Sequence, residues 1–265
     1  MLNQLLADFL FRLTFGIAVA MAGISSRDVT SGFFRVHLWI LLGLQTLAVL
    51  AVFPGGLAFP NALSLQYGLQ YGQLWLALLA AVVSYVGAVL WLYERKLAGK
   101  FAIHVVANCA LVAALLPTLK IVPSSVWFLS VLDRITSGRL IGFAVTSMLL
   151  GHWYLNTPTM KLAPLKRLLF WLAVAVFLRM GVCAIGVQIR CFGSDANPSD
   201  TWYIFLALRW LSGLIGVLVL TILAWQTLKI PNTQSATGIL YATTVLAFIG
   251  ELMSQLLSAG ALYPV

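Results

Sequence analysis

Charged side chains are scarce in this chain of 265 residues: only 9% of them are Asp, Glu, Lys or Arg, and only seven are acidic. Hydrophobic residues make up 62% of the sequence, and the mean hydropathy is +0.99. So few charges cannot cover the surface of a water-soluble domain. The composition therefore excludes a soluble protein and predicts an integral membrane protein.

Cysteine is also rare, and the common catalytic motifs are missing. The three cysteines, Cys109, Cys183 and Cys191, form no CxxC pair, and none lies at ligand spacing from a histidine. This excludes zinc and iron–sulfur sites within the chain, so any iron–sulfur chemistry has to come from a partner. The sequence has neither GxSxG nor HExxH, which argues against a membrane hydrolase.

Long apolar runs are abundant. About 20 helical residues cross the hydrocarbon core of a bilayer, so each run of this length predicts a membrane span. The expected fold is all-α: a polytopic helix bundle of about eight transmembrane helices that forms a single transmembrane domain over residues 1–265. The expected spans are 4–24, 33–53, 73–93, 101–118, 138–155, 166–189, 202–228 and 234–258.

The basic residues indicate how the chain is oriented. The net charge is +9, but the Lys and Arg residues lie mainly in short links, as the positive-inside rule requires, and no nucleic-acid partner is expected. One face carries nine of them: Arg27, Arg35, Arg95, Lys96, Lys100, Lys161, Lys166, Arg167 and Lys229. The other carries five: Arg12, Lys120, Arg134, Arg139 and Arg190. We expect the first face to be cytoplasmic, with both termini outside a bacterial inner membrane.

Two segments between the spans have a mixed composition. Residues 122–135 contain Trp127, Phe128 and the pair Asp133 and Arg134, which predicts an interfacial helix on the outer face. Residues 54–72 contain a doubled Leu-Gln-Tyr-Gly sequence and are expected to form an outer loop, with its aromatic residues as interfacial anchors or as the mouth of a pocket.

The three histidines, His37, His104 and His152, all fall at the predicted cytoplasmic ends of their spans. Two of them on facing helices would hold a b-type haem through neutral imidazoles. Alternatively, one would donate a hydrogen bond to a quinone and transfer its proton. A third interpretation is packing at the lipid headgroups. Polar neighbours such as Tyr154 would orient either ligand.

Charges inside a span are costly unless they are paired or hydrated, so each is a candidate site. Arg179 is the deepest and requires a carboxylate or carbonyl groups. Arg209 and Glu251 lie at similar expected depth, which predicts a salt bridge between the seventh and eighth spans. Gln255 follows Glu251 by one helical turn, and Asp8 and Arg12 have the same spacing in the first span.

Small residues in the last two spans predict that these helices pack closely. They are Ser212, Gly213 and Gly216 in the seventh span and Ser235, Ala236 and Gly238 in the eighth.

The C-terminal stretch has Gly-Glu-Leu at 250–252, Gln-Leu-Leu at 255–257 and Tyr-Pro at 263–264. It is similar to the end of the last helix in membrane anchor subunits of the DMSO reductase and polysulfide reductase class. Eight spans with outward termini also resemble this group. The resemblance implies a subunit that binds a quinone and exchanges electrons with an iron–sulfur subunit, with Glu251 as part of the quinone or proton site.

The leading hypothesis is therefore a quinone-interacting membrane subunit of an electron-transfer complex, which would work with iron–sulfur or cytochrome partners among membrane lipids. Its site residues would be Glu251, Arg209 and Arg179, with His37, His104, His152 and Tyr154 near a cofactor. Two other hypotheses stay open. One is a transporter or channel for a small solute, lined by the same charges. The other is a scaffold subunit in which every charge is structural.

Overall fold

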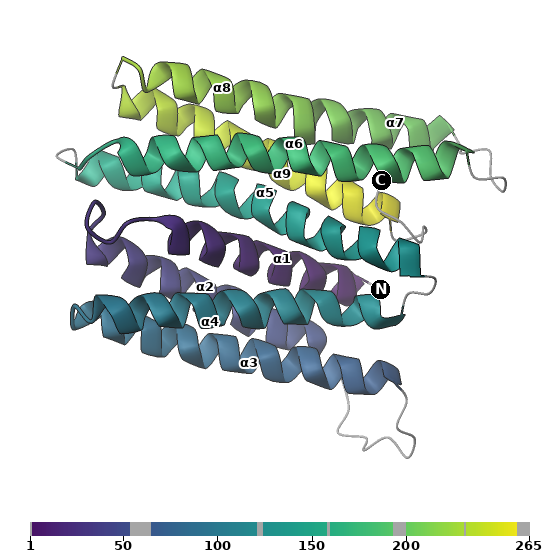
Figure 1. The fold of residues 1–265 in the computed structure, drawn as a ribbon, viewed down its shortest axis with the longest axis horizontal. Helices are drawn as coiled ribbons and strands as arrows, with labels where there is room; N and C mark the ends of the chain where they lie inside the picture. The colour runs from purple at the N-terminus through teal and green to yellow at the C-terminus, as the bar shows by residue number, and fades with distance from the viewer. Residues whose placement is uncertain are drawn as a thin grey trace. The chain divides into compact units, whose positions relative to one another are not determined.

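The computed structural model describes residues 2–53, 65–120, 124–157, 160–192, 200–230 and 232–258. All regular elements in these ranges are helices (Figure 1), which confirms the all-α prediction. They are α1 (Leu2–Gly23), α2 (Ser31–Val52), α3 (Leu65–Leu92), α4 (Lys96–Leu115), η1 (Leu116–Lys120), α5 (Ser124–Asn156), α6 (Ala163–Phe192), α7 (Asp200–Leu208), η2 (Arg209–Gly216), α8 (Val217–Thr227) and α9 (Thr233–Ser258).

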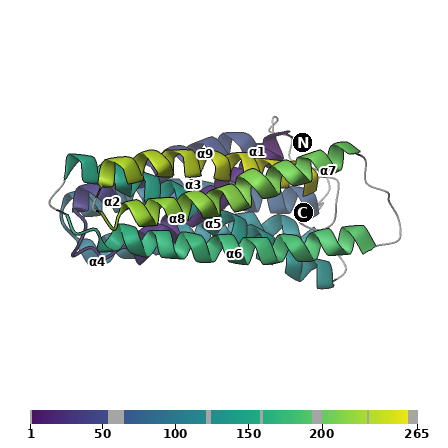
Figure 2. The same cartoon turned by 90° about the horizontal axis from the view of Figure 1, so that it is seen from above.

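Seven helices of the described chain are long and apolar enough to cross a membrane. They are α1, α2, α3, α4, α6, α9 and the continuous rod formed by α7, η2 and α8, which is visible as one long helix in Figure 2. These helices coincide with the expected spans to within about five residues, apart from the earlier start of α3. The protein is therefore an integral membrane protein by the length and composition of its helices.

The predicted separation of an interfacial helix at 122–135 from a span at 138–155 is wrong. Helix α5 starts at Ser124 and continues unbroken through the expected fifth span to Asn156, a length of 33 residues. The mixed composition of its first half, with Trp127, Phe128 and the pair Asp133 and Arg134, favours a surface segment. In the structure Asp133 is only 5% exposed and pairs with an arginine of another helix, which a hydropathy profile of one segment cannot detect.

The doubled Leu-Gln-Tyr-Gly sequence at 65–72 is not a loop, because it forms the first two turns of α3. The remainder of the predicted outer loop, residues 54–64, lies outside the described residues. The side-chain amide of Gln70 donates a hydrogen bond to the carbonyl oxygen of Val52 at 2.8 Å. This contact uses a polar residue of the repeat to join the start of α3 to the end of α2.

The chain divides into two compact units, Met1–Lys120 and Ile121–Val265. In unit 1, α1 and α3 each contact both α2 and α4, so the four helices form a ring in which successive helices are neighbours. An apolar cluster fills this ring, with members Ala7, Leu10, Phe11, Ala48, Val52, Leu74, Ala77, Ala113 and Ala114. The prediction of a single transmembrane domain stays a prediction.

Unit 2 is also a ring of four rods. Helix α5 contacts α6 and α9, and the rod of α7, η2 and α8 contacts both α6 and α9. The rod is not uniform: η2 is a π-helical segment of 8 residues that begins at Arg209. Such wider turns re-aim side chains and are frequent at functional sites.

The closest approach in unit 2 lies between η2 and α9. A Cβ atom built on Gly213 would lie 2.5 Å from the Cα atom of Gly250, closer than real contacts allow. The predicted close packing of the last two spans is thus confirmed at Gly213, whereas Gly238 has open space around its Cα atom. This crossing matters for the site because Arg209 and Glu251 leave the two helices beside it.

We expect Gly250→Ala to destabilise the protein by about 1–3 kcal/mol, because the added methyl group forces two backbones apart. Gly238→Ala on the same helix is the matched control and should be neutral or slightly stabilising. Thermal unfolding of both variants in detergent checks this. Equal melting temperatures for the two variants would show that the crossing has room for a side chain.

Candidate functional site

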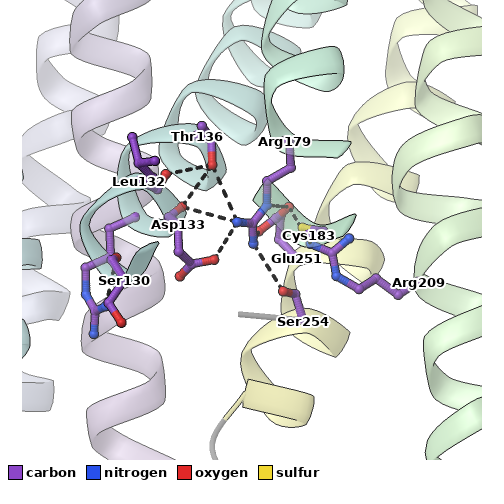
Figure 3. A network of polar contacts seen from close by, with 10 residues as sticks. Ser130, Leu132, Asp133, Thr136, Arg179, Cys183, Arg209, Glu251 and Ser254 are labelled. Atoms are coloured by element: carbon purple, nitrogen blue, oxygen red, sulfur yellow. Dashed lines mark hydrogen bonds and ion pairs between the residues drawn. The ribbon is translucent and has the colours of Figure 1, made fainter. Parts of the chain in front are cut away.

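Four charged side chains meet inside unit 2, one from each of its rods (Figure 3). Asp133 comes from α5, Arg179 from α6, Arg209 from η2 and Glu251 from α9. Both arginines are 0% exposed, and the two carboxylates are 5% and 2% exposed. The cluster contains two positive and two negative groups, so it has no net charge when all four are ionised.

Arg179 lies at the centre of this cluster and donates hydrogen bonds from all three nitrogen atoms of its guanidinium group. Its Nε and Nη2 atoms donate to the two carboxylate oxygens of Glu251, each at 2.9 Å. Its Nη1 atom donates to the carboxylate of Asp133, and also to the Asp133 carbonyl at 3.3 Å and the Thr136 hydroxyl at 3.5 Å. Nη2 further donates to Ser254 at 3.1 Å. Arg179 thereby ties α5, α6 and α9 together.

Arg209 is equally buried but has far fewer partners. Its Nη2 atom donates to the sulfur of Cys183 at 3.0 Å and lies 3.7 Å from Oε1 of Glu251. Its Nε and Nη1 atoms have no hydrogen-bond partner within the described part of the chain. Unpaired donors on a buried charged group are costly, whereas the same donors form strong bonds to an anion or a carbonyl oxygen.

Gln255 adds a second set of unused polar atoms. It follows Glu251 by one turn of α9 and is 6% exposed. Neither its amide nitrogen nor its amide oxygen has a partner among the residues the structure describes. Glu251, Gln255 and Arg209 therefore combine a carboxylate, an amide and a half-used guanidinium group inside unit 2.

The structure brings all three predicted catalytic residues together. The expected pair of Arg209 and Glu251 is present, but Arg179 is the closer, bidentate partner of Glu251. Sequence reasoning missed Asp133 as the second carboxylate. The spacing of Ser130, Asp133 and Ser137 on one face of a helix was the signal that could have identified it.

The histidines of unit 1 are not brought face to face. His37 is 2% exposed on α2, and its Nδ1 atom bonds to the carbonyl of Phe33. His104 is exposed on α4 and bonds to the carbonyl of Lys100 at 2.8 Å. Helices α2 and α4 are opposite members of the ring and are not among its neighbouring pairs. A haem between these two residues has no support from this arrangement.

His152 and Tyr154 lie near the end of α5 in unit 2. His152 is exposed, and its Nδ1 atom is 3.3 Å from the hydroxyl of Tyr241 on α9. The Tyr154 hydroxyl donates to the carbonyl of Lys161, which holds the link between α5 and α6. No group of three His, Cys, Asp or Glu residues in the described ranges is placed to hold a metal ion. The role of these histidines in haem or quinone binding stays a prediction.

No known protein family, curated protein or solved structure matches this chain. The candidate site therefore rests on its own geometry, and the resemblance to the reductase anchor subunits stays a prediction.

We expect Arg179→Leu to lower the stability of the protein by about 3–5 kcal/mol, because it leaves two buried carboxylates opposite one arginine. The double variant Arg179→Leu/Glu251→Gln restores neutrality and should lose less than the sum of the two single variants. Unfolding of the three variants in detergent measures this coupling. Arg139→Leu, at an exposed position of α5, is the control, and strictly additive losses would contradict the proposed coupling.

Proposed function

We propose that the protein is a quinone-interacting membrane subunit of an electron-transfer complex, with its quinone site at Arg209, Glu251 and Gln255. The observation that carries the proposal is the difference between the two buried arginines. Arg179 is saturated with partners, whereas Arg209 keeps two donors, Nε and Nη1, without any in the described chain. Arg179 therefore holds the site together, and Arg209 is available to a ligand.

A quinone suits these groups chemically. Its carbonyl oxygen accepts hydrogen bonds from a guanidinium group, and the positive charge stabilises the negative charge that develops on this oxygen during reduction. The Gln255 amide supplies a further donor. Glu251, 3.7 Å from Arg209, is the nearest carboxylate and is the group that would exchange a proton. The electrons come from a redox partner subunit, because the chain itself has no iron–sulfur motif.

The surroundings favour a ligand dissolved in the bilayer over an ion from water. The rod that carries Arg209 has a continuous apolar outer face with exposed fractions of 42–63%, formed by Leu208, Leu211, Ile215, Val219 and Ile222. Arg209 lies on the buried side of the same rod and is 0% exposed.

We further propose that α5 is the eighth span. At 33 residues it is about 50 Å long, enough to cross a bilayer. Its Asp133 is neutralised by Arg179, which removes much of the cost of a charge at that depth. Eight spans would put both termini on the same side, and the positive-inside rule then predicts that this side is outside a bacterial inner membrane.

Arg209→Lys is expected to weaken the binding of a short-chain quinone to the purified protein at least tenfold. Lysine keeps the charge that Glu251 needs but loses the planar set of donors. Binding is measured by quenching of tryptophan fluorescence during titration with the quinone. Arg139→Lys is the matched control, because Arg139 is an exposed arginine on a helix of the same unit.

Equal affinities for Arg209→Lys and the unmodified protein would remove Arg209 from the site. Absence of quinone both from the titration and from organic extracts of the purified protein would reject the quinone proposal altogether. If liposomes containing the isolated chain then took up a small solute, the transporter hypothesis would replace it.

Fusions to the C-terminus test the eight-span arrangement. Alkaline phosphatase becomes active only outside the bacterial inner membrane. Green fluorescent protein, when fused to a membrane protein inserted by the general secretory route, fluoresces only on the cytoplasmic side. With eight spans and an outward N-terminus, we expect an active phosphatase fusion and a dark fluorescent fusion. An inactive phosphatase fusion and a bright fluorescent fusion would put the C-terminus inside. With an outward N-terminus this means an odd number of spans, so the protein would have seven spans and α5 would lie at the membrane surface.

A further inference from the structure

We propose that the exposed face of α4 is the contact surface of a homodimer, in which α4 pairs with α4 of a second copy of this chain and Asn108 meets its own copy. This inference is independent of the quinone site, which lies in unit 2. It starts from the position of one polar side chain. Asn108 is exposed, and it lies at the middle of the apolar helical stretch Lys96–Leu119.

The depth of Asn108 sets it apart from other polar residues. With a rise of about 1.5 Å per residue, it lies about 17–18 Å from each end of its stretch. The hydrocarbon core is about 30 Å thick, so this side chain is close to the middle of the bilayer. Apart from His104, every other exposed Asn, Gln or His side chain in the described helices lies within two turns of a helix end, near headgroups and water.

The amide group of Asn108 is only partly used within its own helix. Its Nδ2 atom donates to the carbonyl of His104 at 2.8 Å, which is its one hydrogen bond among the described residues. A side-chain amide offers two hydrogens and an acceptor oxygen, so one hydrogen and Oδ1 are left over. Lipid tails bond to neither, and unsatisfied polar groups in hydrocarbon are costly. This favours a protein partner over lipid at Asn108.

The exposed residues of α4 form a stripe that suits a second helix. Leu97 and Phe101 are 88% and 71% exposed, His104 and Asn108 are exposed, and Leu111 is partly exposed. Their spacing alternates between four and three residues, as the a and d positions of a coiled coil do. The residues that pack inside unit 1 lie on the other side of the helix. They are Ala102, Ile103, Val106, Cys109, Ala110 and Ala113.

A second copy of the chain supplies the missing partner by symmetry. Two copies inserted in the same direction are related by a twofold axis along the membrane normal, so each residue lies at the same depth as its copy. Parallel pairing along the stripe therefore puts the two Asn108 amides opposite each other. Each amide donates its spare hydrogen to Oδ1 of the other, which satisfies both groups. A helix of a different subunit would need a matching amide at this depth.

The residues beside the stripe let two helices approach closely. Ala107 and Ala114 flank it on one side, and Ala98 and Val105 on the other. Small flanking side chains of this kind are typical of helix contacts in membranes. Lys100 is the charged residue of these flanks, and its long side chain reaches the headgroups near the start of α4. A single Asn at an a position also fixes the register of a paired coil.

Dilution of the full chain in liposomes tests the proposal. Copies labelled at the C-terminus with a donor or an acceptor fluorophore are mixed at decreasing protein-to-lipid ratios, and energy transfer gives the dimer dissociation constant. Asn108→Leu should raise this constant about tenfold, because the hydrogen bonds between the helices are lost. Thr46→Leu is the matched control. Thr46 is exposed on α2, but its hydroxyl already bonds to the Leu42 carbonyl at 2.9 Å, so the constant should not change.

Disulfide formation in native membranes identifies the surface. The exposed Cys191 is first changed by Cys191→Ser, while the other two cysteines are buried. In this background, oxidation should join two copies through Phe101→Cys, which lies in the stripe. Val36→Cys is the matched control and should not crosslink. Val36 is exposed on α2, five residues after the start of its helix, as Phe101 is on α4.

Energy transfer no greater than that of randomly distributed copies would overturn the proposal, as would equal dissociation constants for Asn108→Leu and the unmodified protein. Crosslinking through Val36→Cys but not Phe101→Cys would also overturn it, by placing the contact on another face. Crosslinking of Phe101→Cys to a protein of different mass would assign the stripe to a partner subunit instead. The two experiments use different variants, so failure of one to fold leaves the other decisive. Arg209→Lys should not change the dissociation constant, which separates this result from the fate of the quinone site.

Discussion

A guanidinium group enclosed on all sides by protein, that of Arg179, is the interaction on which unit 2 depends. Its donors meet the carboxylates of Glu251 and Asp133, so helices α5, α6 and α9 are held at one point by charge-assisted hydrogen bonds. Inside a membrane protein no hydrophobic effect distinguishes helix contacts from lipid contacts, and polar contacts of this kind decide which helices become neighbours. The ring of unit 2 closes around this group.

The second arginine shows how the same chemistry serves a different purpose. Arg209 balances the charge of the cluster but contributes few bonds to it. It is aimed inward by the π-helical segment η2, and the glycine crossing with α9 fixes its distance from Glu251. Arg179 uses all its donors to hold the helices together, whereas Arg209 keeps two donors unused. The structural function of the cluster therefore belongs to Arg179, and its proposed function of binding a quinone belongs to Arg209.

The two units handle buried polarity by different means. Unit 2 concentrates charge at one point and neutralises it with opposite charge. In unit 1, Arg12 is also buried, but most of the buried polar groups, such as His37, Gln45 and Ser84, are neutral and are spread along the helices. Neutral polar groups are less costly to bury than ions, so they can be placed one after another.

The sequence by itself determined the all-α fold and the positions of seven apolar helices long enough to cross a membrane, because the hydrophobic length of a helix is a local property. It also placed Arg209 and Glu251 at matching depth. Only the tertiary structure decided that α5 is one helix from Ser124 to Asn156, that Asp133 pairs with Arg179, and that His37 and His104 lie apart. A charged residue such as Asp133 is interpreted as a surface residue until its partner is known. Its partner, Arg179, lies 46 residues away in the chain.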